Sequence, residues 1–114
     1  MSAITTHVLD TSRGRPAAGV AISLEARDDD GTWSFVGSGS TDDDGRLRTL
    51  IPSGVALEAR VYRITFDTGR YFEKLGVEGF YPEASIVFQV RDPSQHFHVP
   101  LLLNPFGYST YRGS

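Results

Sequence analysis

The sequence predicts an all-β fold, a sandwich of two sheets with about eight strands and one short helix. Segments rich in Val, Ile, Thr, Tyr and Phe recur at short intervals, separated by clusters of Gly, Pro and Asp. Apolar residues alternate with polar ones at Tyr62, Ile64 and Phe66, which is typical of a strand with one buried face. The expected strands are Ile4–Asp10, Val20–Arg27, Thr32–Ser38, Arg46–Leu50, Leu57–Asp67, Ala84–Val90, Phe97–Leu103 and Thr110–Arg112.

Turn chemistry separates these strands. Asp30-Gly31 and Asp44-Gly45 close two of them, because glycine adopts the positive φ that tight turns need. The acidic runs before these glycines could suggest calcium, but they lack the further ligands of an EF-hand loop, so turns are the preferred interpretation. Apolar residues at positions 71, 72 and 75, followed by Gly76, predict a short helix within residues 68–76.

Length and composition narrow the possible partners. The 114 residues suit a single domain spanning 1–114, and 39% hydrophobic with 22% charged residues is typical of a globular protein. A formal net charge of −3 disfavours nucleic acid, and no apolar run approaches the roughly 20 residues that a membrane helix needs. The sequence lacks cysteine and a secretory leader, so we expect a cytoplasmic location and no disulfide.

Two of the three histidines share one face of an expected strand. The apolar residues of Phe97–Leu103 point to one side, while His98, with His96 two residues earlier, points to the other. Such a pair can transfer protons or bind a metal, or it can be a polar pair on the solvated side of a half-buried strand. Their spacing alone leaves these alternatives open.

Four further residues are candidate site residues, but each of them taken alone has a more ordinary explanation. His7 lies in mid-strand, where an isolated histidine is usually satisfied or solvated, and Arg46 follows a turn, where an arginine is usually a solvated edge residue. Ser114 lies at the end of the sequence, where residues commonly fray, and Tyr111 can either pack or donate a hydrogen bond.

A set of motifs that extends over nearly the whole sequence favours a functional role for these candidate residues. The motifs are Thr6-His7-Val8-Leu9-Asp10, Gly14-Arg15-Pro16-Ala17, Thr41-Asp42-Asp43-Asp44-Gly45-Arg46, Tyr71-Phe72, Phe80-Tyr81-Pro82-Glu83, His96 to Leu103 and Tyr111-Arg112-Gly113-Ser114. Together they resemble the transthyretin-related proteins and, within them, the 5-hydroxyisourate hydrolases of urate degradation. The last motif is similar to the hydrolase signature that distinguishes these enzymes from hormone-carrying transthyretins.

The resemblance implies a fold and an assembly. The fold would be a transthyretin-like (prealbumin-like) sandwich. Edge strands would pair two copies into a dimer, and two dimers would pack into a homotetramer with active sites at the dimer–dimer interface.

The resemblance also implies a reaction, the hydrolysis of 5-hydroxyisourate to 2-oxo-4-hydroxy-4-carboxy-5-ureidoimidazoline without a cofactor. His7 and His98 match the catalytic histidines and Arg46 the substrate-binding arginine. Tyr111 and Ser114, with His96, would complete the substrate-binding wall through side chains or the terminal carboxylate. Water attacks a ring amide carbonyl in this reaction, so a histidine that takes its proton and an arginine that polarises the oxygen form a sensible set.

Three alternatives remain from the sequence. The first is a transthyretin-like carrier that binds a small ligand without chemistry. The second is a zinc hydrolase in which His7, His96 and His98 hold the metal. The third is a β-sandwich interaction module with an incidental terminal motif, since a fold alone does not fix a function.

Overall fold

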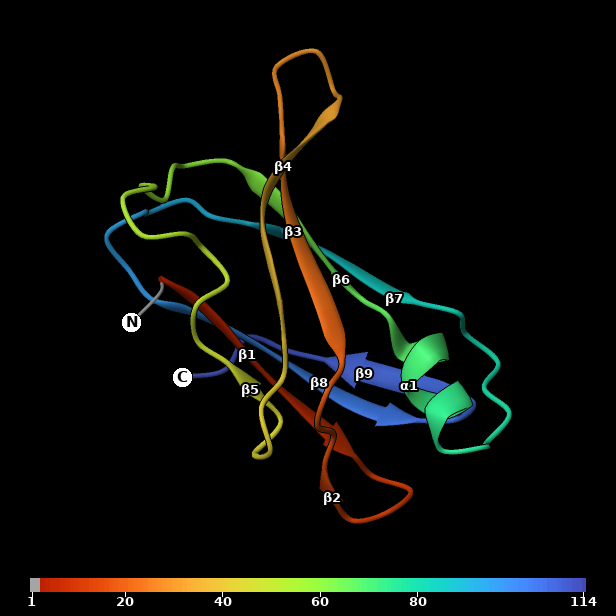
Figure 1. Cartoon of the computed structure of the whole chain (residues 1–114). Helices are drawn as coiled ribbons and strands as arrows, with labels where there is room; N and C mark the ends of the chain where they lie inside the picture. The colour runs from red at the N-terminus through yellow and green to blue at the C-terminus, as the bar shows by residue number, and fades with distance from the viewer. Residues whose placement is uncertain (1–2) are drawn as a thin grey trace.

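Two β-sheets pack face to face and one short helix lies at their end in the computed structural model, which describes residues 3–114 (Figure 1). Residues 1 and 2 of the expected 1–114 domain lie outside the described part. The described strands are β1 (Ile4–Asp10), β2 (Arg15–Pro16), β3 (Ala21–Arg27), β4 (Trp33–Ser40), β5 (Arg46–Leu47), β6 (Val61–Phe66), β7 (Ala84–Gln89), β8 (Phe97–Asn104) and β9 (Gly107–Thr110), and the helix is α1 (Thr68–Lys74). The all-β sandwich with one short helix is therefore confirmed.

The first sheet contains the strand pairing on which the candidate site depends. Its order is β2-β1-β8-β9, and β5 pairs with β1 beside β2. The pairing of β1 with β8 is parallel, whereas β1 with β5 and β8 with β9 are antiparallel. The second sheet has the antiparallel order β4-β3-β6-β7.

The core lies between the sheets and fixes which side chains of the first sheet point outward. Ile4 and Val8 of β1 and Val99 and Leu101 of β8 are buried in this core. Because successive side chains of a strand point to opposite faces, Thr5 and His98 belong to the outer face of the sheet, as does His7. The predicted separation of apolar and histidine faces along β8 is confirmed by its burial pattern.

Several predicted strand boundaries were wrong. The strand expected over Arg46–Leu50 ends at Leu47, and the chain then leaves the sheet to bury Leu50 in the core. The strand expected from Leu57 begins at Val61, because the preceding segment is turned and the Tyr62 hydroxyl accepts a bond from its backbone at Glu58, 3.1 Å.

The sequence also misplaced the last strand and missed one pairing. The strand expected at Thr110–Arg112 is β9, Gly107–Thr110, and beyond it Gly113 makes an isolated bridge to His98. Arg15–Pro16, which lies between the expected strands Ile4–Asp10 and Val20–Arg27, pairs as β2 with the end of β1.

The two acidic runs are turns, as predicted. Gly31 and Gly45 have φ of 87° and 75°, the left-handed region that favours glycine. The carboxylates of the first run are engaged locally, with Asp28 accepting from Ser34 and pairing with Arg60 at 2.8 Å.

Helix α1 is joined to the first sheet by a buried polar contact. Asp67 caps its first turn by accepting a bond from the Arg70 amide, 3.2 Å. The Tyr71 hydroxyl then donates to the carboxylate of Asp10, which is fully buried at the end of β1, at 2.8 Å. No helix within residues 3–114 is long and apolar enough to cross a membrane.

Candidate functional site

A small polar hollow lies on the outer face of the first sheet, with a volume of about 200 Å³. We call it the histidine hollow. Its lining residues come from β1, from β5 and the residue after it, from β8 and the residue before it, and from the C-terminal tail. They are Thr5, Thr6, Arg46, Arg48, His96, His98 and Ser114. Four of the six residues predicted from the sequence, Arg46, His96, His98 and Ser114, are thus brought together.

The parallel register of β1 and β8 places Thr5 directly beside His98. The Thr5 hydroxyl lies 2.8 Å from Nδ1 of His98 and 2.9 Å from Nε2 of His96. Thr5 is only 5% exposed, so both hydrogen bonds are shielded from water on the threonine side. Since Nδ1 of His98 is engaged with Thr5, Nε2 is its nitrogen without a hydrogen-bond partner among the described residues.

The surroundings of His98 favour its neutral form. Partial burial lowers the pKa of the His98 imidazole below its usual 6.5, and the positive charges of His7, Arg46 and His96 lower it further. His98 is therefore uncharged at neutral pH, with one ring nitrogen able to accept a proton.

His7 is held at the side of the histidine hollow by a backbone carbonyl. Its Nε2 lies 2.9 Å from the carbonyl oxygen of Asp44, which accepts hydrogen bonds only, so Nε2 must carry the proton. Neutral His7 then has its lone pair on Nδ1. His7 is also the register partner of Arg46 in the pairing of β1 with β5.

Arg46 is positioned by the tight turn that precedes it. One carboxylate oxygen of Asp42 accepts bonds from the amides of Asp44 and Arg46, both at 2.9 Å, and these bonds lower the pKa of Asp42. Gly45 lies so close to β1 that an added Cβ would come within 2.4 Å of the Val8 carbonyl oxygen. Only glycine fits this position, and the turn therefore brings the Arg46 backbone directly against β1.

The C-terminal tail crosses the His98 end of β8. The Arg112 guanidinium lies 4.5 Å above the Phe97 ring and bonds to Gln95, and the Gly113 amide donates to the His98 carbonyl at 2.9 Å. An added Cβ at Gly113 would lie 2.6 Å from Cδ2 of His98. The tail thus brings Ser114 to the hollow and packs against the imidazole.

Tyr111 is not among the residues that line the histidine hollow. It lines a more apolar groove with Ile86, Phe88 and Phe97, at the margin between the two sheets, and His98 contributes to this groove as well. His98 therefore lies between the histidine hollow and the groove that holds Tyr111.

Four residues at the site, Thr5, Thr6, Arg48 and Gly113, were missed from the sequence. Thr5 in a strand rich in β-branched residues carries no sequence signal of a polar role, and Arg48 lies just past the expected start of a strand. Gly113 belongs to the terminal motif, but its close approach to His98 follows only from the fold.

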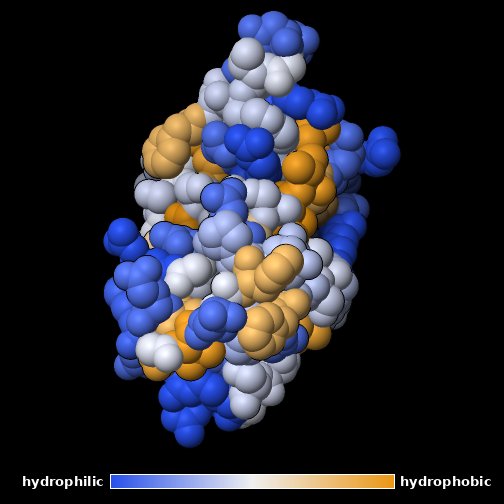
Figure 2. Space-filling view, turned by 90° about the vertical axis from the view of Figure 1, so that its right-hand side faces the viewer, coloured by the Kyte–Doolittle hydropathy of each residue, from blue (hydrophilic) through white to orange (hydrophobic). Residues whose placement is uncertain are grey.

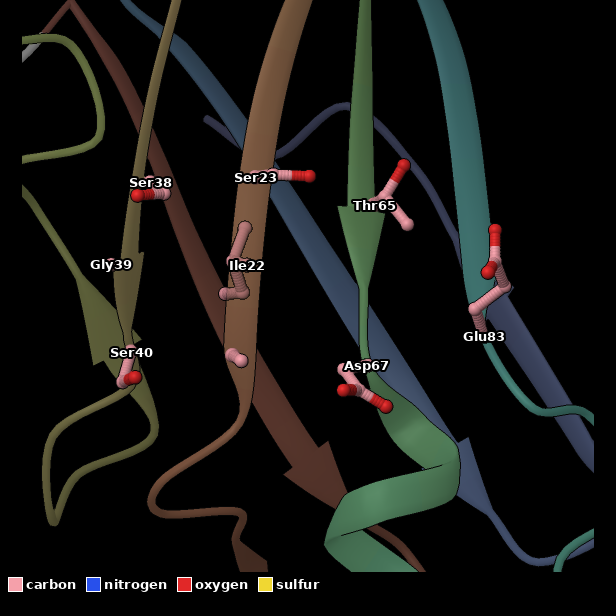
Figure 3. Close-up of a pocket in the computed structure, with 9 residues that line it drawn as sticks. Ile22, Ser23, Ser38, Gly39, Ser40, Thr65, Asp67 and Glu83 are labelled. Atoms are coloured by element: carbon pink, nitrogen blue, oxygen red, sulfur yellow. The ribbon is translucent and has the colours of Figure 1, made fainter. Parts of the chain in front are cut away.

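A larger hollow of about 570 Å³ lies on the second sheet. Its lining is hydroxyl-rich, with Ser23, Ser38, Ser40 and Thr65, and includes the carboxylates of Asp67 and Glu83. Figure 3 shows these side chains spread across neighbouring strands of an open surface, and Asp67 is already engaged as the cap of α1. This surface has no imidazole or guanidinium to activate water or bind an oxyanion, so the smaller histidine hollow is the better candidate.

The histidines are not arranged as a metal site. His96 and His98 both aim a ring nitrogen at the Thr5 hydroxyl, and His7 aims one at a carbonyl. Within residues 3–114, no three His, Cys, Asp or Glu side chains converge closely enough to hold a metal ion. The arrangement instead offers a neutral imidazole base beside a guanidinium, which suits proton abstraction next to a developing negative charge.

We expect the His98 imidazole to titrate below pH 6.5. The three histidines can be followed by NMR across pH 4.5–8.5 and His98 identified by the signal missing in His98→Asn. Since protonation is opposed by burial and by neighbouring positive charge, the signal should move at lower pH than that of a free imidazole. A midpoint at or above 6.5 would contradict this account of the hollow.

Comparison with known proteins agrees with the fold and identifies the family. The family model described as HIUase/Transthyretin matches residues 4–113. The 5-hydroxyisourate hydrolase of Salmonella dublin is 44% identical over 111 residues, covering 97% of this chain and 80% of that protein. The crystal structure of Klebsiella pneumoniae 5-hydroxyisourate hydrolase is similar with a TM-score of 0.81 and 38% identity, covering 97% of this chain and 98% of that one. Transthyretin from Sparus aurata has a TM-score of 0.90 and 31% identity, with 99% and 97% covered. The chain belongs to the HIUase/transthyretin family.

Proposed function

We propose that this protein is a hydrolase that opens the ring of 5-hydroxyisourate, a step of urate degradation, to give 2-oxo-4-hydroxy-4-carboxy-5-ureidoimidazoline. The observation that carries the proposal is the presence of His98, Arg46 and Ser114 around one hollow, with His7 beside Arg46. Hydrolases of this name that are about 44% identical over nearly the whole chain support it. The cytoplasmic location expected from the sequence stays a prediction.

In the proposed mechanism His98 is the general base. Its lowered pKa keeps it neutral at pH 7, and Nε2 faces no hydrogen-bond partner among the described residues. It takes a proton from water as the water oxygen attacks a ring carbonyl, and the proton then passes to the ring nitrogen that leaves. His7, fixed through Nε2–H to the Asp44 carbonyl, positions the water or substrate.

Arg46 would bind and polarise the substrate. Its guanidinium offers a planar set of N–H donors, which match the adjacent carbonyl oxygens of a flat urate-like ring. The same donors stabilise the negative charge that develops on oxygen when the carbonyl becomes tetrahedral. Ser114 lines the same hollow and would add a hydroxyl contact to the ring.

The geometry also supports a homotetramer. The hollow of about 200 Å³ is smaller than the roughly 300–1,000 Å³ of typical small-molecule sites, so a second copy is needed to close it over a substrate. Strands β7 and β9 are free sheet edges on one side of the sandwich (Figure 1). Figure 2 shows apolar patches on that side, and Val87, Phe106 and Phe80 are 56%, 64% and 66% exposed. Free edges with apolar neighbours are suited to pairing with another copy.

Turnover tests the proposal directly. Hydroxyisourate generated in situ from urate with urate oxidase should decay faster with the protein than without it, as followed by ultraviolet absorbance. We expect His98→Asn to lower the rate by about 10²–10⁴ and Arg46→Gln by about 10²–10³, because a general base and an electrostatic stabiliser are lost.

A matched control is Arg91→Gln, which removes an exposed arginine in a turn outside the hollow and should leave the rate unchanged. Decay at the spontaneous rate with the wild-type protein, accompanied by saturable binding of the ligand, would replace the hydrolase with a carrier.

Activity should survive removal of metals. Ring nitrogens of His96 and His98 meet at the Thr5 hydroxyl and that of His7 bonds to the Asp44 carbonyl, so the three do not share a point where zinc could bind, and the proposed mechanism uses no zinc-activated water. Dialysis against a strong chelator, with the metal content checked by mass spectrometry, should leave the turnover rate within error. A rate that is lost on chelation and restored by Zn²⁺ would instead establish the metal hydrolase.

The oligomeric state can be measured by size-exclusion chromatography with light scattering. We expect a mass about four times the 12.5 kDa of one chain. Val87→Lys, on the edge strand β7, places a charge at the proposed contact and should shift the population to smaller species. A monomer at micromolar concentration that retains full activity would refute the shared-site arrangement.

A further inference from the structure

Thr5 holds the two histidines of the hollow through a single hydroxyl. Its Oγ1 lies 2.8 Å from Nδ1 of His98 and 2.9 Å from Nε2 of His96. A hydroxyl has one proton to donate and lone pairs to accept with, so it cannot donate to both rings. The protonation states of the two imidazoles are therefore linked: at most one of these nitrogens is unprotonated, and the other must donate.

Only some of the possible arrangements leave His98 able to act as a base. If Thr5 donates to Nδ1 of His98, the proton of the neutral ring lies on Nε2, and no lone pair faces the hollow. If Nδ1–H of His98 donates to Thr5 instead, Nε2 has the free lone pair, and the hydroxyl proton can be donated to His96.

We propose that Thr5 is a positioning residue that holds neutral His98 with its proton on Nδ1, so that Nε2 is the basic nitrogen, and that links His98 to His96 for proton transfer. The part concerning catalysis rests on the proposed hydrolase function. The part concerning the two rings does not.

In this proton transfer each proton that leaves one atom is received by another, and no group carries more than one charge. After His98 has taken a proton on Nε2, its Nδ1–H bond breaks and that proton moves to the Thr5 oxygen. At the same time the Thr5 O–H proton moves to Nε2 of His96. Thr5 ends as a hydroxyl, His98 as a neutral ring protonated on Nε2 and His96 as an exposed imidazolium. When Nε2 of His98 gives its proton to the leaving ring nitrogen, the transfer runs in reverse: His96 returns its proton to Thr5, the Thr5 proton returns to Nδ1 of His98, and the starting tautomer is restored.

The burial of Thr5 supports a specific role. A threonine that merely filled a strand position on the outer face would be solvated, whereas this one is 5% exposed and both its bonds are to imidazoles. The charged and titratable groups around the pair are His7 of β1, Arg46 of β5, Arg48 just after β5, and Arg112 of the tail.

The test compares Thr5→Val with Thr5→Ser. Valine has the same shape and suits a strand but lacks the hydroxyl, while serine restores it. Long-range ¹H–¹⁵N NMR of the imidazoles distinguishes the Nδ1–H from the Nε2–H form. We expect neutral His98 to be Nδ1–H in the wild-type protein and in Thr5→Ser, and to become mainly Nε2–H in Thr5→Val.

Kinetics supply a second readout. In Thr5→Val, kcat should fall about 10- to 100-fold, with KM little changed. The size of the effect is taken by analogy from metal-binding histidines that lose the hydrogen-bond partner that orients them. The pH at which kcat falls should shift as well. Thr5→Ser should recover most of the rate. A folded Thr5→Val protein with an unchanged His98 tautomer and an unchanged pH–rate profile would overturn the proposal.

The two proposals fail in different ways. A wild-type protein that does not accelerate hydroxyisourate decay removes the proposed function, but the NMR comparison still decides whether Thr5 sets the His98 tautomer. Conversely, an active enzyme whose His98 carries its proton on Nε2 removes the role of Thr5 and leaves the hydrolase in place.

Discussion

The parallel pairing of β1 with β8 is the constraint on which the site depends. It joins segments separated by most of the chain and fixes Thr5 opposite His98. The buried Thr6 hydroxyl donates to the Val99 carbonyl across the same pair at 2.5 Å, which helps to hold this register. A slip of one residue in either strand would turn its outward side chains into the core, at the cost of burying an imidazole and exposing apolar residues. The register that packs the core is therefore the same register that places His98, the proposed base, on the outer face.

Arg46, the positively charged side chain proposed to bind the substrate, comes from the turn and strand β5 that pack along the other edge of β1. The turn from Asp42 to Arg46 is tied by its own hydrogen bonds and pressed against β1 at Gly45, while the amide of Val8 donates to the Gly45 carbonyl at 2.7 Å. The loop therefore has little freedom, and Arg46 of β5 is paired directly with His7 of β1. Such preorganisation matters because donors that are already in place need no reorganisation when charge develops on the substrate.

Alternation and turn glycines were enough to predict the sandwich and the short helix, and the family resemblance carried by the motifs pointed to four of the residues around the hollow. Period-two patterns identify the buried face of a strand, and β8 shows how well this works. The sequence did not show which strands pair with each other, because the parallel neighbour of a strand can lie anywhere in the sequence. This is why Thr5 was missed: in its own strand it resembles any β-branched residue, and its polar role exists only through two histidines at the far end of the chain. Tyr111, just beyond β9, lies in an apolar groove that it shares with His98, and its predicted contact with the substrate stays a prediction.

The backbone alone does not separate catalysis from transport, because a transthyretin and a hydrolase both share this fold. The difference lies in the outward side chains of the first sheet. An apolar ligand in the histidine hollow would strip water from imidazoles, a guanidinium and a hydroxyl without replacing their hydrogen bonds, which is unfavourable for each group. A flat heterocycle rich in carbonyl and N–H groups can replace them. The hydrogen bond between His98 and the buried Thr5 bears on the same point, because the role proposed for Thr5, setting which imidazole nitrogen receives a proton, would serve catalysis and not passive binding. The chemistry of the hollow is therefore better matched to breaking a ring amide than to carrying an intact ligand.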